Sequence, residues 1–147
     1  MNVKVKIWDT SGQERYRSLT KNFYSQADGV IIVYDITERS TFDRVRGWIE
    51  SVLENKDSVN LILVGNKIDL DNHREVQKEE GKDFALKRNN IPFYETSAKE
   101  NIEIDHCIMD LVREIMNSER RKNKTKGDSL DNFNTPDGNS SNACCYS

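Results

Sequence analysis

An aspartate, a glycine and a glutamine lie close together just after an apolar segment near the start of the chain. They are Asp9, Gly12 and Gln13, within the sequence IWDTSGQERYRS of residues 7–18. In phosphoryl transfer, a carboxylate at the end of a strand can hold magnesium, a glycine lets a backbone N–H approach a terminal phosphate, and a glutamine can orient the attacking water. The order of these residues is therefore suited to a site that handles the phosphate tail of a nucleotide.

A second polar motif, Asn66-Lys67-Ile68-Asp69, directly follows the apolar run LILVG. An aspartate can accept two hydrogen bonds from N1–H and the 2-amino group of guanine, whereas adenine presents no matching pair of donors. A buried donor or acceptor left unpaired costs roughly 1–3 kcal/mol, which is enough to select one purine. The stem of Lys67 can lie along the plane of a base, and Asn66 can bind the base and connect neighbouring loops. Alone, the motif is equally typical of a loop that caps a helix.

A third polar motif, Thr96-Ser97-Ala98-Lys99, follows another strand-like segment at residues 91–95. Alone, these residues favour the polar entry to a helix. Because the ends of parallel strands meet at one edge of a sheet, we expect all three motifs to lie at that edge. Their combination favours a ligand site over three unrelated loops.

The three motifs resemble those of the Ras-like small GTPases, and of the Rab branch in particular. Residues 8–18 resemble switch II, which usually begins WDTAGQE and here has Ser11 in place of the alanine. Residues 66–69 resemble the family's N-K-x-D motif, and residues 96–99 resemble its last guanine loop. The resemblance implies that the complete protein binds GTP or GDP with Mg²⁺ and hydrolyses GTP as a switch.

The resemblance also implies a role for each residue of the motifs. Asp9 would hold the magnesium through a water, the Gly12 N–H would contact the γ-phosphate, and Gln13 would orient the attacking water. Guanine would be held by Asn66, Lys67, Asp69 and the Ala98 N–H, and the loop would be braced by Ser97 and Lys99.

Further segments resemble the Rab branch, namely residues 4–8, 15–20, 23–24 and 33–37. In that branch, exposed aromatic residues near switch II help to bind effectors. The resemblance implies as partners an effector, an exchange factor and a GTPase-activating protein. The alternative for Trp8, Tyr24 and Tyr34 is ordinary packing in the core, because the sequence does not distinguish exposed from buried aromatic residues.

The surrounding pattern predicts an α/β fold, with a mostly parallel sheet and flanking helices. Strands are predicted at residues 1–9, 29–36, 59–64 and 91–95, since these segments alternate or are continuously apolar. A helix is predicted after Ser40, with an apolar face at Phe42, Val45, Trp48, Ile49 and Val52. Two more are predicted at residues 75–87, with Val76, Phe84 and Leu86 facing inward, and at residues 103–121, with Ile104, Ile108, Leu111, Val112 and Ile115 on one stripe. Residues 19–27 are predicted to form a short helix or turn.

Composition limits the function classes that remain. The chain has 147 residues, which suits one domain, and its net charge of −3 gives no case for nucleic-acid binding. The longest apolar runs, residues 30–33 and 61–64, are far shorter than a membrane span. The spacing of the three cysteines predicts neither a disulfide framework nor a zinc site.

The end of the chain differs in composition from the rest. We expect a domain at residues 1–120 and a disordered tail at residues 121–147, which is rich in Asp, Asn, Ser and Gly. The basic run RRKNKTK of residues 120–126 suits either a solvated helix end or a membrane surface. Cys144 and Cys145 precede two final residues, as in the paired-cysteine Rab pattern. That resemblance implies a geranylgeranyl group on each cysteine, which would hold the protein on the cytoplasmic face of an endomembrane or vesicle, with a cytosolic pool.

The opening part of the Ras-like pattern does not occur in the sequence, which contains no G-x-x-x-x-G-K-[ST] motif and no switch I threonine. In the family, the strand before that motif lies between the strands predicted here at residues 1–9 and 29–36. We therefore expect two strand edges without partners, an unstable chain and an incomplete N-terminus. The alternatives are a non-enzymatic membrane-tethered binding module or a non-functional truncated product. A generic flavodoxin-like domain explains the layers but not the three motifs.

Overall fold

A computed structural model describes residues 3–10, 24, 26–56, 58–127 and 140–146 of the chain, and the side chains of these residues as far as residue 119. In chain order the elements are β1 (Lys4–Thr10), β2 (Gly29–Asp35), α2 (Arg39–Asn55), β3 (Asn60–Asn66), the 3-10 helix η2 (Ile68–His73), α3 (Lys78–Leu86), β4 (Phe93–Thr96), α4 (Ile104–Gly127) and β5 (Ser140–Tyr146).

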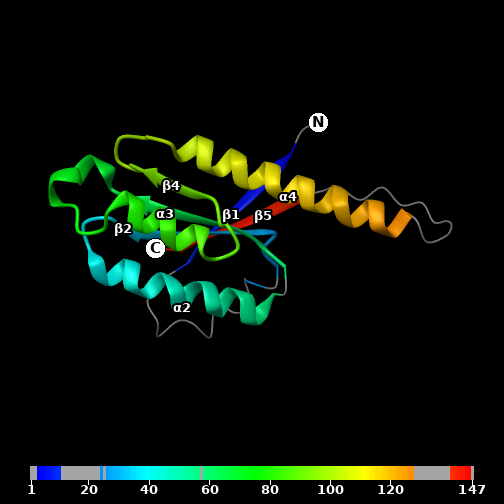
Figure 1. Cartoon of the computed structure of the whole chain (residues 1–147). Coiled ribbons are helices and arrows are strands. Elements are labelled where there is room, and N and C mark those ends of the chain that lie inside the picture. The colour runs from blue at the N-terminus through cyan, green and yellow to red at the C-terminus, as the bar shows by residue number, and fades with distance from the viewer. Residues whose placement is uncertain (1–2, 11–23, 25, 57, 128–139, 147) are drawn as a thin grey trace.

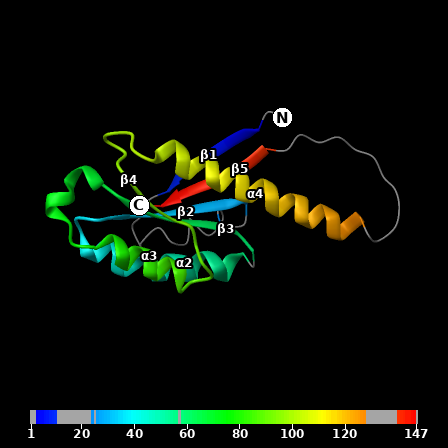
Figure 2. The ribbon, with the colours of Figure 1, turned by 45° about the horizontal axis from the view of Figure 1, so that its top comes forward.

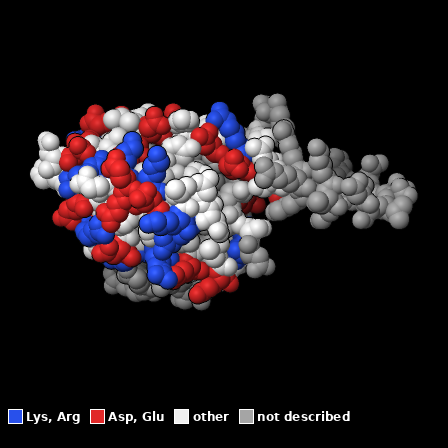
Figure 3. Space-filling view, viewed as in Figure 1, with Lys and Arg blue, Asp and Glu red and all other residues white. Residues whose placement is uncertain are grey.

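The five strands form one sheet in the order β1-β5-β2-β3-β4, and every pair of neighbours is parallel. Helices α2 and α3 lie on one side of the sheet and α4 lies on the other (Figures 1 and 2). The predicted α/β class, with a mostly parallel sheet and flanking helices, is therefore confirmed. On the face seen in Figure 3, acidic and basic side chains are interspersed rather than gathered by sign.

The core is divided by the sheet because successive side chains of a strand point to opposite faces. On one side, Val30, Ile32 and Tyr34 of β2 pack with the buried stripe of α2. On the other side, Ile31 packs with Leu111 and Ile115 of α4. The predicted faces of both long helices are confirmed, although Ile104 and Ile108 of α4 are only half-buried.

The three aromatic residues for which effector binding and core packing were the alternatives all pack in the core. Tyr24 and Tyr34 are buried, and Trp8 is half-buried against the α2 side of the core.

The prediction for α3 is partly wrong. Val76 is buried, but it precedes the helix, and Leu86 is 60% exposed. Residues 84 and 86 lie about 200° apart around a helix, so they cannot share one face.

The end of the chain differs from expectation. Helix α4 continues to Gly127, and residues 140–146, for which disorder was expected, form β5 in the middle of the sheet. All of β1 pairs with β5, and Gly29–Ile32 of β2 pairs with Ala143–Tyr146. Of the two strand edges that were expected to lack partners, that of β1 is paired along its length and that of β2 over its first four residues. Backbone N–H and C=O groups buried in a sheet require such partners.

Gly81 of α3 is placed where a larger residue does not fit. A Cβ atom added there would meet the Tyr34 hydroxyl and would lie 2.8 Å from Cζ of Phe93. The Tyr34 hydroxyl is buried and makes no hydrogen bond with any residue that the structure describes. Glycine lets α3 approach β2 and β4 at this point, and this outweighs its low helix propensity.

We predict that Gly81→Ala destabilises the protein by about 1–3 kcal/mol, because the core is overpacked there. Tyr34→Phe should be neutral or stabilising, since it removes a buried hydroxyl without a partner. The double variant should recover part of the loss, because the closest clashing atom is gone. Thermal and urea unfolding of the four proteins measure these effects. A stabilising Gly81→Ala would contradict the close approach.

Candidate functional site

Three polar residues lie side by side where three neighbouring strands end. Asp35 of β2 is in register with Asn66 of β3, and Asn66 is in register with Thr96 of β4. This is the carboxyl edge of the sheet, where parallel α/β sheets bind their ligands. The loops that follow these strands carry two of the three motifs found in the sequence.

Asn66 joins the end of β3 to the loop after β4. Its side-chain Oδ1 accepts a hydrogen bond from Thr96 Oγ1 at 3.1 Å and another from the Ala98 N–H at 3.0 Å. Thr96 is buried. One amide oxygen therefore fixes the position of both the strand end and the loop. If the Ala98 N–H donates a hydrogen bond to a base, it must share or give up its hydrogen bond to Asn66 Oδ1.

Asp69 makes a second link between the same two loops. The Ser97 hydroxyl donates a hydrogen bond to Asp69 Oδ1 at 2.6 Å, and Lys99 Nζ lies 3.9 Å from Asp69 Oδ2. Ser97 is fully buried, and its Oγ also accepts a hydrogen bond from the Glu100 N–H. The carboxylate of Asp69 is thus held in one orientation by a buried hydroxyl, with a cation beside its second oxygen.

Lys67 adopts a left-handed backbone conformation, with φ 73°. This is uncommon for a residue with a Cβ and marks a sharp turn between β3 and η2. Its Nζ lies 2.6 Å from Asp35 Oδ2, and its side chain is 50% exposed. The ion pair fixes the lysine stem over the edge between β2 and β3.

Asp35 is held by several donors at once. Its Oδ1 accepts hydrogen bonds from the Thr37 N–H at 2.8 Å and from the Thr37 hydroxyl at 2.7 Å. Burial raises the pKa of Asp35, but the hydrogen bonds from Lys67 and Thr37 outweigh it, so the pKa lies below its ordinary value of 3.8. The same hydrogen bond from Lys67 to Asp35 raises the pKa of Lys67. Both groups therefore carry charge at neutral pH.

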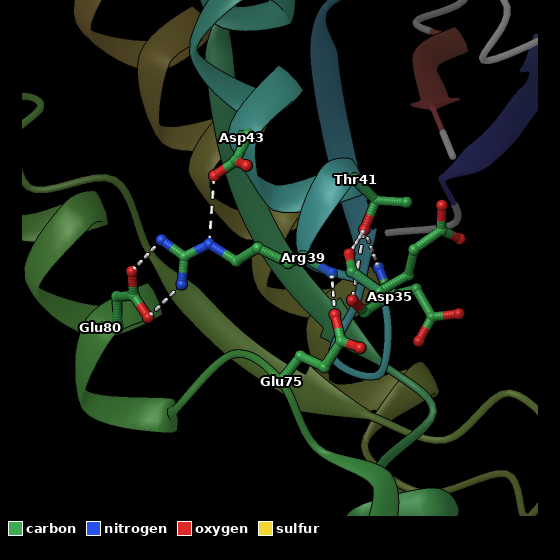
Figure 4. Close-up of polar contacts among 7 residues, drawn as sticks. Asp35, Arg39, Thr41, Asp43, Glu75 and Glu80 are labelled. Atoms are coloured by element: carbon green, nitrogen blue, oxygen red, sulfur yellow. Dashed lines mark hydrogen bonds and ion pairs between the residues drawn. The ribbon is translucent and has the colours of Figure 1, made fainter.

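The loop after Asp35 is tied to the start of α2 and to α3 (Figure 4). The Thr41 hydroxyl accepts a hydrogen bond from the Asp35 N–H at 3.0 Å, and Glu75 Oε2 accepts one from the Arg39 N–H at 2.8 Å. An acidic group at a helix N-terminus satisfies an unpaired N–H and suits the helix dipole. The Arg39 guanidinium also pairs with both carboxylate oxygens of Glu80 in α3. The segments that flank the site are therefore connected through side chains.

A partly buried ion pair connects the end of η2 to β4. Arg74 pairs with Glu95, and their side chains are 13% and 8% exposed. Arg74 also pairs with Asp71 and donates a hydrogen bond to the Val76 carbonyl. The segment that follows Asp69 is thereby fixed, which limits how far the Asp69 loop can move.

The chain matches known sequences over most of its length. A sequence model of the Ras family matches residues 1–117. The chain belongs to the Ras family. It is 38% identical over 146 residues to Ras-related protein Rab-13 of Bos taurus, covering 97% of this chain and 71% of that protein. It is 40% identical to Ras-related protein Rab-8A of Rattus norvegicus (94% of this chain, 63% of that protein) and 41% identical to Ras-related protein Rab11D of Nicotiana tabacum (90% and 60%).

These relatives carry Rab names, so the resemblance to the Rab branch of the Ras-like small GTPases is confirmed. Against Rab-8A and Rab11D, the matched chain spans less than two thirds of the relative's length. In the family, guanine nucleotide and Mg²⁺ binding and GTPase activity are general properties. In the described part of this chain, the carboxylate of Asp69 and the Ala98 N–H both lie in the loops that Asn66 and Ser97 join at one edge of the sheet.

The phosphate-handling residues are less completely described. Gly12 and Gln13 lie outside the described residues, as does most of the predicted helix at residues 19–27. Asp9 is exposed and pairs with Cys145 of β5, which is level with Ile31 of β2. Asp35 lies four residues farther along β2, or about 13 Å. The structure therefore brings Asn66, Asp69, Ser97, Ala98 and Lys99 together but places Asp9 apart from them.

In the part of the chain that the structure describes, no group of three or more His, Cys, Asp or Glu side chains is placed to hold a metal ion. Mg²⁺ usually takes one or two protein carboxylates and fills its other positions with phosphate oxygens and water. A single carboxylate at Asp9 is compatible with that donor set.

A cavity among the described residues lies away from the candidate site. It has a volume of about 770 Å³ and lies near the opposite ends of β2 and β3, where its lining includes Asp28, Asn60 and Ile115.

Sequence reasoning missed Asp35, Thr37 and Arg74 as residues that build the site. The signal for Asp35 was available, because it ends the buried strand beside the one that ends at Asn66.

We predict that Asp35 contributes to the pH dependence of stability. Because its pKa is lower in the folded state, its contribution is present above the unfolded value of 3.8 and is lost as pH falls through the folded pKa. Asp35→Asn should therefore lose less stability than the unmodified protein between pH 6 and pH 3. Urea unfolding over that range measures the difference, and Asp83→Asn, an exposed change of equal charge on α3, is the control. Parallel curves for Asp35→Asn and the unmodified protein would refute the prediction.

Proposed function

We propose that the protein binds guanine nucleotide with Mg²⁺ and hydrolyses GTP as a membrane-trafficking switch of the Rab type. The observation that carries this proposal is the linkage of Asn66, Asp69, Ser97 and Ala98 at one edge of a parallel sheet. In this arrangement Asp69 accepts the N1–H and 2-amino hydrogen bonds of guanine. The stem of Lys67 covers the base, and the Ala98 N–H contacts its carbonyl.

The phosphate tail is assigned to the segment after β1. When bound, Mg²⁺ neutralises charge that develops on the phosphate oxygens. Asp9 would hold that ion through a water, the Gly12 N–H would contact the γ-phosphate, and Gln13 would orient the attacking water. Asp9 lies apart from the loops after β3 and β4, which contain residues 66–69 and 96–99 and are called the base-reading loops. This separation supports different sites for the base and the phosphates, because the base and the γ-phosphate lie at opposite ends of a nucleotide.

The partners in this proposal are an effector, an exchange factor and a GTPase-activating protein. Attachment to the cytoplasmic face of an endomembrane or vesicle would come from geranylgeranyl groups on Cys144 and Cys145. Within the described residues, no helix combines the length and apolar character needed to cross a bilayer.

A second candidate function is that of a membrane-tethered module that binds guanine without turnover. It is favoured by the hydrogen bonds that join the loops after β3 and β4 to each other.

The first test is selectivity between GTP and ATP, measured by fluorescent-nucleotide binding with Mg²⁺ on the purified protein. Asp69→Asn keeps an oxygen for the Ser97 hydroxyl but replaces the other acceptor by a donor. We expect it to weaken GTP binding roughly 10–100-fold, in line with about 1–3 kcal/mol for mismatched polar groups. Asp83→Asn should bind as the unmodified protein does.

Equal affinity for GTP and ATP would contradict the guanine assignment. Phosphate release measured alongside binding separates the two candidates. Turnover that Gln13→Leu abolishes supports the GTPase, and selective binding without turnover supports the non-enzymatic module.

The lipid assignment is tested separately. We expect a cell lysate to transfer a labelled geranylgeranyl group to the protein, and Cys144→Ser and Cys145→Ser each to remove one equivalent. The double variant should remain in the soluble fraction when vesicles are floated on a density gradient. Labelling of the double variant at Cys107, which is buried, would contradict the assignment.

A further inference from the structure

Several carboxylates attract Lys67, and the structure pairs it with Asp35. Its Nζ lies 2.6 Å from Asp35 Oδ2. The hydrogen bond to Asp35 is the largest cause of the raised pKa of Lys67, and the charges of Glu38 and Asp69 raise that pKa further. A lysine ammonium group is a compact cation on a flexible stem, so it pairs with whichever carboxylate is best placed. The surrounding residues therefore determine which carboxylate has Lys67 as its partner.

Asp35 is well placed because the rest of its polar groups are already engaged. Its Oδ1 accepts hydrogen bonds from the Thr37 N–H at 2.8 Å and the Thr37 hydroxyl at 2.7 Å, so Oδ2 is the oxygen presented to Lys67. The Asp35 N–H donates a hydrogen bond to the Thr41 hydroxyl, which fixes the backbone at the same point (Figure 4). The Asp35 side chain is 14% exposed. The acceptor is thus oriented before the ion pair forms, so pairing orders few further groups.

The backbone end of the Lys67 side chain is fixed as well. The residue has φ 73° and ψ 36°, in the left-handed region that a residue with a Cβ seldom adopts. Its carbonyl accepts a hydrogen bond from the Leu70 N–H at 2.9 Å, which closes the turn that contains Asp69. Asp35 therefore holds the far end of a stem whose near end is set by that turn.

The Asp69 carboxylate is the group that a misplaced ammonium group would disturb. Its Oδ1 accepts a hydrogen bond from the Ser97 hydroxyl at 2.6 Å, and Lys99 Nζ lies 3.9 Å from Oδ2, beyond hydrogen-bonding distance. In the proposed function, this carboxylate also accepts two hydrogen bonds from guanine. A carboxylate has about four lone-pair sites, and a charged donor forms a stronger hydrogen bond than the neutral donors of a base. An ammonium group bound to Asp69 would therefore compete with guanine for the same oxygens.

We propose that Asp35 is a positioning residue for base selectivity: by binding the Lys67 ammonium group, it keeps that group off Asp69 and leaves the Asp69 carboxylate to guanine. Asp35 acts through Lys67 and not by contact with the base. It belongs to β2 and lies outside both motifs of the base-reading loops. This inference rests on the proposed guanine binding.

Two substitutions separate the carboxylate from the lysine. Asp35→Asn keeps an oxygen for the Thr37 donors but places an uncharged group opposite Lys67. Lys67→Met keeps a stem of similar length and removes the cation. Dissociation constants for fluorescent GDP and ADP with Mg²⁺ are measured on the full chain, each single variant and the double variant, since diphosphates avoid turnover. Asp83→Asn and Lys82→Met, exposed changes of the same kinds on α3, are the matched controls.

The quantity compared is the ratio of the ADP dissociation constant to the GDP dissociation constant. We expect Asp35→Asn to lower this ratio roughly tenfold, because the released ammonium group pairs with Asp69. In the Lys67→Met protein and in the double variant, we expect a ratio within about twofold of the unmodified protein, because the competing cation is absent. Partial unfolding weakens the binding of both nucleotides by one factor and leaves the ratio unchanged, so a loss of stability does not imitate the result.

Two outcomes of this cycle would overturn the inference. One is a ratio that Asp35→Asn leaves unchanged. The other is an equal fall of the ratio in Asp35→Asn and in the double variant, because Asp35 would then act without Lys67. If Asp35→Asn does not fold, Asp35→Ser also removes the charge while keeping an oxygen, and the same expectations apply to it.

NMR of the lysine ammonium groups tests the change of partner without any nucleotide. The Lys67 signal is assigned as the one that Lys67→Met removes. We expect Asp69→Asn to shift this signal little in the unmodified protein and clearly in the Asp35→Asn protein, where Lys67 pairs with Asp69. Equally small shifts in both proteins would refute the change of partner.

The two assays distinguish a failure of this inference from a failure of the proposed function. Equal affinity of the unmodified protein for GDP and ADP refutes the guanine assignment and the selectivity role of Asp35 together. Selective binding of GDP without the change of partner refutes this inference alone and leaves the proposed function supported.

Discussion

Every strand buried inside a sheet needs a hydrogen-bonding partner on each edge, and β2 shows how much depends on that requirement. It is covered by α2 on one face and by α4 on the other, so neither of its edges can rely on water along the buried residues. One edge is paired with β3 and the other, over its first four residues, with β5. Among the described strands β1 pairs with β5 alone, and its Trp8 also packs against the α2 side of the core.

The candidate site depends on the register of three neighbouring strands and on the side chains that join the loops after them. Asp35, Asn66 and Thr96 are level with one another because three parallel strands are in register, and the loops beyond them are joined by Asn66 and Asp69. The carboxylate of Asp69 is oriented by a buried serine hydroxyl rather than by solvent. A base that binds here meets groups whose positions are already fixed, so little ordering of the site opposes binding.

The sequence predicted those features that depend on local periodicity or on a short motif. The stripe of α2 and the two buried strands β2 and β3 follow from spacing, because the side-chain periods of helices and strands are fixed by geometry. Leu86 was misplaced because apolar character was used without its angle around the helix. The pairing of Lys67 with Asp35 was missed because it joins residues 32 positions apart, whose proximity depends on the neighbouring order of β2 and β3. Strand β5 was missed because its composition alone resembles a disordered end, and its pairing with β1 and β2 joins residues more than 100 positions apart.

The register of β5 also has a practical consequence for anyone who engineers this protein. The strand ends at Tyr146, level with Ile32, and β2 continues for three more residues to Asp35. A polypeptide that continued β5 in the same direction would therefore run along the edge of β2 toward Asp35. An affinity tag or fluorescent domain fused at this end of the chain would follow directly on the strand that pairs with both β1 and β2.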